Sequence, residues 1–196
     1  MKKIYIVLTH TGTILSRIIK SYTKDEFSHV SISLDETLEN MYSFGRINPY
    51  NPFIGGFVHE YINKGTFKRF YNTKAKIYSL EVSDKQYEII KNEIKFIELE
   101  KNKYKFNIAG LFAVGFSKKI GGENSFYCAE FVKYLFEKAK IGMILPEIVR
   151  PENFNNRDEL IEVYHGFLRK YNAEKVKFSD ILKESILLYN KKESIV

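Results

Sequence analysis

Apolar and polar residues follow two different patterns in the first part of the chain, and both predict strands. Residues 3–9 form a short, largely apolar run rich in β-branched side chains, which is typical of a buried strand. Residues 27–34 alternate instead, so that apolar side chains share one face while His29 and neighbouring serines share the other. The second strand is therefore expected to have an apolar back and a polar front that carries His29.

Apolar residues at helical spacing predict helices elsewhere. The segment 83–101 opens with Ser and, three residues later, Gln, the pattern of a capping box, and continues at steps of three and four. A shorter helix is expected over 14–22, and another over 125–139 with Cys128 in its first turn. The same patterns predict strands over 41–46, 66–71, 74–82 and 160–169, a terminal helix over 179–189, and either a buried helix or a packed loop over 108–116.

The composition fits one folded domain. The 196 residues are 44% hydrophobic and 15% aromatic, far more core-forming material than a disordered chain carries. The chain has no run of about 18 uncharged apolar residues, and its first apolar run is too short for a signal peptide, so neither a transmembrane segment nor export is expected. A single cysteine, Cys128, cannot form an internal disulfide, so we expect a reducing, cytoplasmic location.

Positive charge is concentrated in one segment. The formal net charge is +7, and residues 61–80 hold five basic residues and no acidic one. Such a segment could meet an anionic lipid surface, a polyanionic polymer or nucleic acid. The alternative is a solvated hairpin with lysines on its outer face. Aromatic residues among the lysines also suit single-stranded nucleic acid, but on strands such residues more often fill a core, so nucleic-acid binding is not expected.

Cys128 is a candidate nucleophile because of its place in a helix. A thiol in the first turn sees the positive end of the helix dipole and free backbone amides, which favour a thiolate and stabilise an oxyanion. The alternative is a buried, inert cysteine that packs as a small apolar residue. His29, on the polar face of an otherwise packed strand, supplies a base that a helix on that sheet could reach.

Three segments together resemble one known family. Residues 11–34, the run Phe126-Tyr127-Cys128-Ala129-Glu130-Phe131-Val132 and residues 150–154 look like the histidine strand, nucleophile helix and following proline segment of the permuted NlpC-type papain-like proteins of the YiiX and YebB group. These proteins are related to the lecithin:retinol acyltransferase-like proteins, and the histidine precedes the cysteine in them, as His29 precedes Cys128 here.

The resemblance implies an α+β fold of the permuted papain-like type, with an antiparallel sheet packed against the cysteine helix and the helix over 83–101. This domain would span residues 1–155, and residues 156–196 would extend it with a strand and a helix.

The resemblance also implies site residues. Cys128 would be the nucleophile and His29 the general base. The third polar group comes from the next strand in this family, where Ser43 is the candidate for orienting the imidazole; turn carboxylates Asp35, Glu36 and Glu39 are alternatives. Substrate contacts are expected from Tyr127, His10 and Thr11. His59 and His165 are expected to be structural, and neither a metal nor a cofactor is expected.

The expected function is that of a cysteine-dependent hydrolase or acyltransferase, which acts on an amide or ester of a small peptide, such as a peptidoglycan-type peptide, or of a lipid, through a thioester. The alternative is a catalytically silent domain of the same fold that binds an anionic ligand or surface through residues 61–80.

Overall fold

The computed structural model describes residues 1–13, 24–51, 54–108, 110, 122 and 124–171. The helices expected over 14–22 and 179–189, and most of the segment 108–116, lie outside the described residues.

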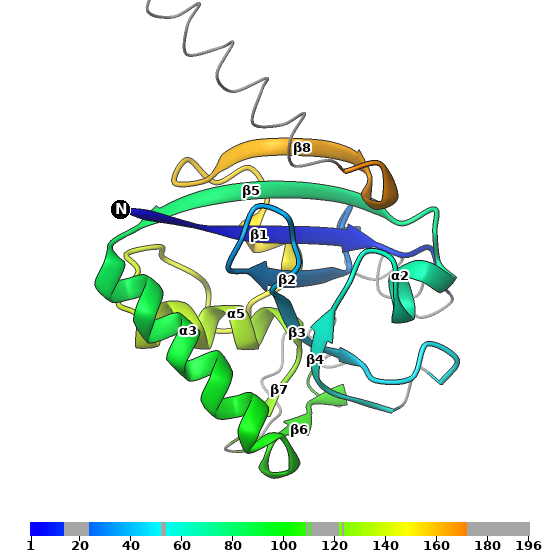
Figure 1. The fold of residues 1–196 in the computed structure, drawn as a ribbon, viewed down its shortest axis with the longest axis horizontal. Coiled ribbons are helices and arrows are strands. Elements are labelled where there is room, and N and C mark those ends of the chain that lie inside the picture. The colour runs from blue at the N-terminus through cyan, green and yellow to red at the C-terminus, as the bar shows by residue number, and fades with distance from the viewer. Residues whose placement is uncertain (14–23, 52–53, 109, 111–121, 123, 172–196) are drawn as a thin grey trace, which may run out of the picture.

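A six-stranded antiparallel sheet forms the centre of the molecule (Figure 1). The strand order is β4-β3-β2-β1-β5-β8, and every described pairing in this sheet is antiparallel. A separate parallel pair joins two short strands, β6 and β7. The strands are β1 (Lys2–His10), β2 (His29–Ser33), β3 (Met41–Arg46), β4 (Gly55–Glu60), β5 (Lys74–Val82), β6 (Lys105–Phe106), β7 (Ser125–Phe126) and β8 (Ile161–Phe167).

Two helices of the described chain cover one face of this sheet. Helix α3 (Asp84–Leu99) begins with the expected capping box, because the Ser83 hydroxyl accepts from the Gln86 backbone and the Gln86 side chain accepts from the Ser83 backbone. Helix α5 (Cys128–Lys138) packs on β2 and β3 and against α3. The expected α+β class with an antiparallel sheet is confirmed.

Buried side chains form a core on each face of the sheet. The larger core lies between the sheet and the helices, where the Phe44 ring lies 5.3 Å from the rings of Phe126 and Phe131. The smaller core lies on the opposite face, around Val7, Met41, Phe67, Ile77 and Leu168. The central strands are therefore buried on both faces, and Ser31, Ser33 and Ser43 are enclosed among them.

The prediction of a strand over residues 66–71 is wrong. The short helix α2 (Gly65–Arg69) covers most of this segment, and the carbonyl of Thr66 accepts from the backbone of Phe70. Aromatic residues suggested a strand, but only Phe67 is buried here, so the segment lacks the alternating buried face that would hold a strand in a sheet.

The chain after residue 155 contributes an edge strand to the same sheet. Strand β8 pairs with β5 from Lys74–Phe167 to Ser79–Ile161. His165, expected in the core, has a side chain that is 50% exposed and lies 4.0 Å from Glu26. That expectation is wrong because β8 is an edge strand with largely exposed side chains. Three short 3-10 helices complete the described elements: η1 (Lys101–Lys103), η3 (Pro151–Phe154) and η4 (Leu168–Lys170).

No helix in the described ranges is long and apolar enough to span a bilayer.

Candidate active site

His29 opens strand β2, opposite Thr9 of β1, and its side chain is 19% exposed. The imidazole lies against strand β3 at Gly45, where an added Cβ would stand 3.2 Å from the ring Cε1 atom. The ladder between β2 and β3 covers only Ile32–Tyr42 and Ser33–Met41, so it ends before it reaches His29. The polar face that alternation predicted for this strand is thus largely enclosed: Ser31 and Ser33 are buried, and His29 is mostly buried.

Glu60 is the partner of the imidazole. It ends strand β4, its side chain is 9% exposed, and its Oε1 and Oε2 atoms lie 3.1 and 3.4 Å from His29 Nε2. Ser31 completes the cluster: its hydroxyl donates to Glu60 Oε2, and its Oγ lies 3.3 Å from His29 Nε2. With Nε2 occupied by Glu60, we infer that Nδ1 is the ring nitrogen left to face another group.

Cys128 lies near the ring, because its side chain is among the groups that shift the pKa of His29. It is the first residue of α5, and its side chain, 3% exposed, belongs to the larger core. Burial lowers the pKa of His29, but the negative charges of Glu60 and Cys128 and hydrogen bonds to both side chains raise the pKa to about 10. Helix α5 packs on β2, and Cys128 lies near enough to His29 to act on the charge of the ring; the roles of nucleophile and base stay predictions.

The contact with His29 shifts the pKa of Glu60 in the opposite direction. Burial raises the pKa of this carboxyl, but the charge of His29 and the hydrogen bonds from His29 and Ser31 lower it below its ordinary value, and the nearby Ser43 hydroxyl lowers it further. At neutral pH the pair is therefore an imidazolium beside a carboxylate. A positively charged imidazole next to the first turn of a helix favours the thiolate form of a cysteine there.

Ser43 does not orient the ring, and this corrects the expectation. The side chain is fully buried, and its hydroxyl makes no hydrogen bond of ordinary geometry with a described residue, although it lies close enough to Glu60 to lower the pKa of that carboxyl. The ring contact belongs to Glu60, a charged group. None of the turn carboxylates, Asp35, Glu36 or Glu39, contacts the imidazole among the described interactions; Asp35 caps its own turn.

A signal for Glu60 was present in the sequence. It is the only acidic residue between positions 40 and 80, and only His59 separates it from the apolar pair Phe57 and Val58. An isolated carboxylate at the end of a packed strand needs a partner, since a buried charge without one is costly. The sequence pattern did not reveal the partner, because β3 lies between β2 and β4 both in the sequence and in the sheet.

Tyr127 packs inside the molecule, which corrects the expected substrate contact. Its side chain is 2% exposed, and its hydroxyl donates to the Val149 carbonyl at 2.8 Å. The ring fills the core beneath the start of α5, and the backbone N–H of the same residue donates to Glu130 Oε2 at 3.1 Å. Tyr127 thus fixes the helix end that carries Cys128 and presents no surface to a ligand.

His10 and Thr11 lie at the end of β1 that adjoins the site. Thr9 pairs with His29, and the next residue, His10, has its Nδ1 atom 3.4 Å from Ser28 Oγ. Both His10 and Thr11 are partly exposed. Their position beside His29 agrees with a place on the rim of the site, and contact with substrate stays a prediction.

Residues 150–152, in the proline segment that follows α5, bind the residues that lead into β2. Glu152 Oε2 accepts from the backbone N–H groups of Glu26 and Phe27 at 3.1 and 3.3 Å, and Arg150 pairs with Asp25 at 3.2 Å. The segment that enters β2, and with it His29, is therefore tied to residues more than a hundred positions later.

Within the described ranges, no three His, Cys, Asp or Glu side chains are grouped as a metal site requires. His59, expected to be structural, lies between the rings of Tyr42 and Tyr61 at 4.5 and 4.3 Å, and its Nε2 donates to the Glu39 carbonyl.

Comparison with known proteins adds no relative: no family model matches the chain, and no significant match was found among curated proteins or solved structures.

Proposed function

We propose that this protein is a cysteine-dependent hydrolase or acyltransferase that acts on an amide or ester through a thioester on Cys128. The observation that carries the proposal is the enclosed His29–Glu60 pair, which lies beside the start of the helix that carries Cys128. A nucleophile, a base and a group that orients the base are the three parts that such catalysis needs.

The first half of the proposed reaction forms the thioester. The Cys128 thiolate attacks the carbonyl carbon, and the oxygen gains a negative charge next to the first-turn backbone amides of α5, which have no partner within the helix. The C–N or C–O bond then breaks while the His29 imidazolium donates its proton to the departing amine or alcohol. The products of this half are the acyl-cysteine and a neutral imidazole.

The second half returns the enzyme to its starting state. Neutral His29 takes a proton from water, whose oxygen attacks the thioester, and the C–S bond breaks with release of the acid and the thiolate. An alcohol or amine in place of water gives acyl transfer by the same steps. Glu60 stays ionised throughout and stabilises the imidazolium whenever it forms.

The arrangement of elements supports a permuted papain-like fold for this chemistry. The histidine strand precedes the cysteine helix, that helix packs on the strand, and the sheet is antiparallel. The family resemblance of residues 126–132 adds peptidoglycan-type peptides and lipids as the two substrate classes to test first.

A second candidate function is a silent domain that binds an anionic ligand or surface. The observation that favours it is the burial of Cys128, which is 3% exposed, as expected of a packing residue. The carboxylate of Glu60 argues against it, because a domain without catalysis has no need of a buried ion pair beside its only thiol.

Acylation by an activated ester distinguishes the two. The native protein is incubated with p-nitrophenyl acetate, and the intact mass and nitrophenol release are followed with time. We expect one acetyl group on Cys128, followed by turnover, and losses of about 10²-fold or more in rate for His29→Ala. His165→Ala, the same change on the exposed edge strand, is the matched control and should behave as wild type. Labelling that occurs only in denaturant, or at equal rates in both variants, would leave the silent domain as the better account.

A further inference from the structure

A group of exposed basic residues lies where α2, the start of β5 and η4 meet. Thr73 accepts from the Leu168 backbone at 2.9 Å, and Lys74 pairs with Phe167 across the sheet, so these segments are neighbours although they are nearly a hundred residues apart in sequence. We call this surface the basic–aromatic face. Its exposed cations are Lys68, Arg69, Lys74, Arg169 and Lys170, and its exposed rings are Tyr50, Tyr71 and Phe167.

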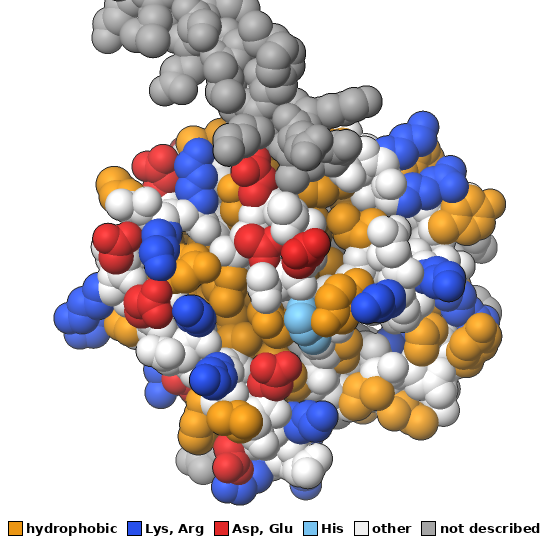
Figure 2. Space-filling model, in the orientation of Figure 1, with side chains coloured by type: hydrophobic (Ala, Val, Ile, Leu, Met, Phe, Trp, Pro, Cys, Tyr) orange, Lys and Arg blue, Asp and Glu red, His pale blue; other side chains and the backbone are white. Residues whose placement is uncertain are grey.

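Among the described residues, no acidic side chain pairs with the cations of this face. Residues 65–76 and 163–171 contain no acidic residue. Figure 2 shows Lys and Arg side chains without Asp or Glu over the right side of the molecule, where α2 and η4 lie. Burial lowers the pKa of nearby Arg46, and the positive charge of Arg69 lowers it further, as expected where cations face one another.

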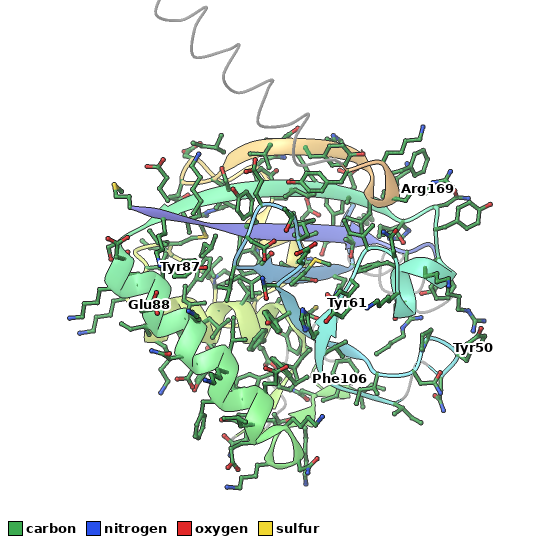
Figure 3. All side chains as sticks on the ribbon, in the orientation of Figure 1. Tyr50, Tyr61, Tyr87, Glu88, Phe106 and Arg169 are labelled. Atoms are coloured by element: carbon green, nitrogen blue, oxygen red, sulfur yellow. The ribbon has the colours of Figure 1, made fainter. Side chains whose placement is uncertain are left out.

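Exposed aromatic rings stand among these cations. Tyr50 is 78% exposed, Tyr71 55% and Phe167 38%. Tyr50 and Arg169 both lie at the edge of the molecule on this side in Figure 3. Exposure of large rings to water does not stabilise a protein. At the level of lipid headgroups such rings are favoured, because their apolar part leaves water while their polar part stays hydrated.

Each ring has a cation over its face. The Arg69 guanidinium carbon lies 3.8 Å from the Tyr50 ring centre, and that of Arg169 lies 4.7 Å from the Tyr71 ring centre; Lys170 Nζ lies 5.8 Å from the centre of Phe167. Single-stranded nucleic acid binds by stacking bases on such faces, and a cation already covers one face of each ring here. Ring edges flanked by cations instead match a bilayer surface, which takes up the rings and attracts the charges.

We propose that the basic–aromatic face docks the protein on an anionic membrane surface, with the cations at the lipid phosphates and the rings among the headgroups. The docking is peripheral and reversible, and it is independent of the proposed chemistry at Cys128.

Vesicle co-sedimentation of the full chain tests this. Vesicles of pure phosphatidylcholine are compared with vesicles of equimolar phosphatidylcholine and phosphatidylglycerol. We expect binding to the anionic vesicles alone, weakened by added salt, and weakened about tenfold or more by the double variant Lys68→Glu/Arg69→Glu. The control is Lys85→Glu/Lys95→Glu, which makes the same charge change at exposed positions of α3 on the other side of the molecule. Thermal melting establishes that both variants are folded.

A second variant separates docking from general charge attraction. Tyr71→Ser keeps the net charge and removes an exposed ring, and we expect it to weaken binding to anionic vesicles severalfold. Three results would overturn the proposal: no binding to anionic vesicles, equal losses in both double variants, or preferential binding of a single-stranded oligonucleotide that competes with the vesicles. Because no activity is measured, any of these leaves the proposed function at Cys128 standing.

Discussion

Glu60 Oε1 lies 3.1 Å from His29 Nε2, although the two residues belong to strands that are not neighbours in the sheet. Strand β3 runs between them and presents its two smallest side-chain positions, Ser43 and Gly45, beneath the pair. A Cβ added at Gly45 would stand 3.2 Å from the imidazole, 3.2 Å from Ser43 Oγ and 3.6 Å from Glu60 Oε1. The ion pair can cross β3 because Ser43 and Gly45 are small enough to leave room for the two side chains.

Gly45→Ala tests this spanning contact. The added methyl group would push on the imidazole and on Ser43, so we expect a loss of about 1–3 kcal/mol in unfolding free energy and a larger proportional loss in acylation rate. The matched control is Gly56→Ala at the position paired with Gly45, since its Cβ would meet only the end of the exposed Ile47 side chain. Urea denaturation and p-nitrophenyl acetate kinetics measure the two quantities. Wild-type kinetics in Gly45→Ala would mean that the ring does not depend on this space.

Replacing the carboxylate separates the roles of Glu60 and Ser43. Glu60→Gln keeps the shape but removes the charge that raises the pKa of His29, so burial should dominate and that pKa should fall well below its native value. We expect acylation to slow by about 10²-fold or more in Glu60→Gln and by less than about tenfold in Ser43→Ala. Titration of the His29 ring by NMR gives the pKa directly. An unchanged titration in Glu60→Gln would show that the charge of Glu60 does not control the ring.

Most strands, the two longer helices and the faces that carry His29 and Cys128 followed from short-range patterns, whereas the pairing of Cys128 with His29 was expected from the family resemblance. Alternation in residues 27–34 located the polar face, and the helical pattern in residues 125–139 put the thiol in a first turn. Such patterns report which face of one element is buried. They carry no information on which elements meet, and Glu60 was missed for that reason.

The predictions of a substrate contact for Tyr127 and of a strand over residues 66–71 were wrong for a related reason. An aromatic ring beside a nucleophile can either line a site or fill the core beneath it, and only the neighbouring Val149 carbonyl decides between them. Around Phe67 the local residues favoured a strand, but the segment forms a short helix that packs one buried ring, Phe67, into the smaller core. Tertiary context decides such short segments.

The ion pair should make stability depend on pH in both directions. The pKa of His29 is raised, so its contribution is complete below the ordinary value of 6.5 and is lost as the pH rises toward about 10. The pKa of Glu60 is lowered, so its contribution is complete above the ordinary value of 4.5 and is lost as the pH falls below it. We therefore expect maximal stability between these two ordinary values.

Urea denaturation from acidic to alkaline pH measures this dependence. The double variant His29→Gln/Glu60→Gln removes both titrating groups and is the reference to subtract. A wild-type profile that parallels the reference above pH 6.5 would contradict the raised pKa of His29.

The last prediction concerns Glu152, which binds the segment that leads into the strand of His29. Glu152→Ala removes the carboxylate that accepts from the backbone of Glu26 and Phe27, so two backbone donors lose their partner and the entry to β2 loosens. We expect a stability loss of about 1–3 kcal/mol, a slower acylation of Cys128 and a lower pKa of His29, because the ring no longer holds its position against Glu60. Glu152→Gln keeps an acceptor oxygen at the same place and should restore most of each quantity. If Glu152→Ala lowers stability but leaves the His29 titration and the acylation rate at wild-type values, Glu152 serves the fold alone and the ring is held by its neighbours in the sheet.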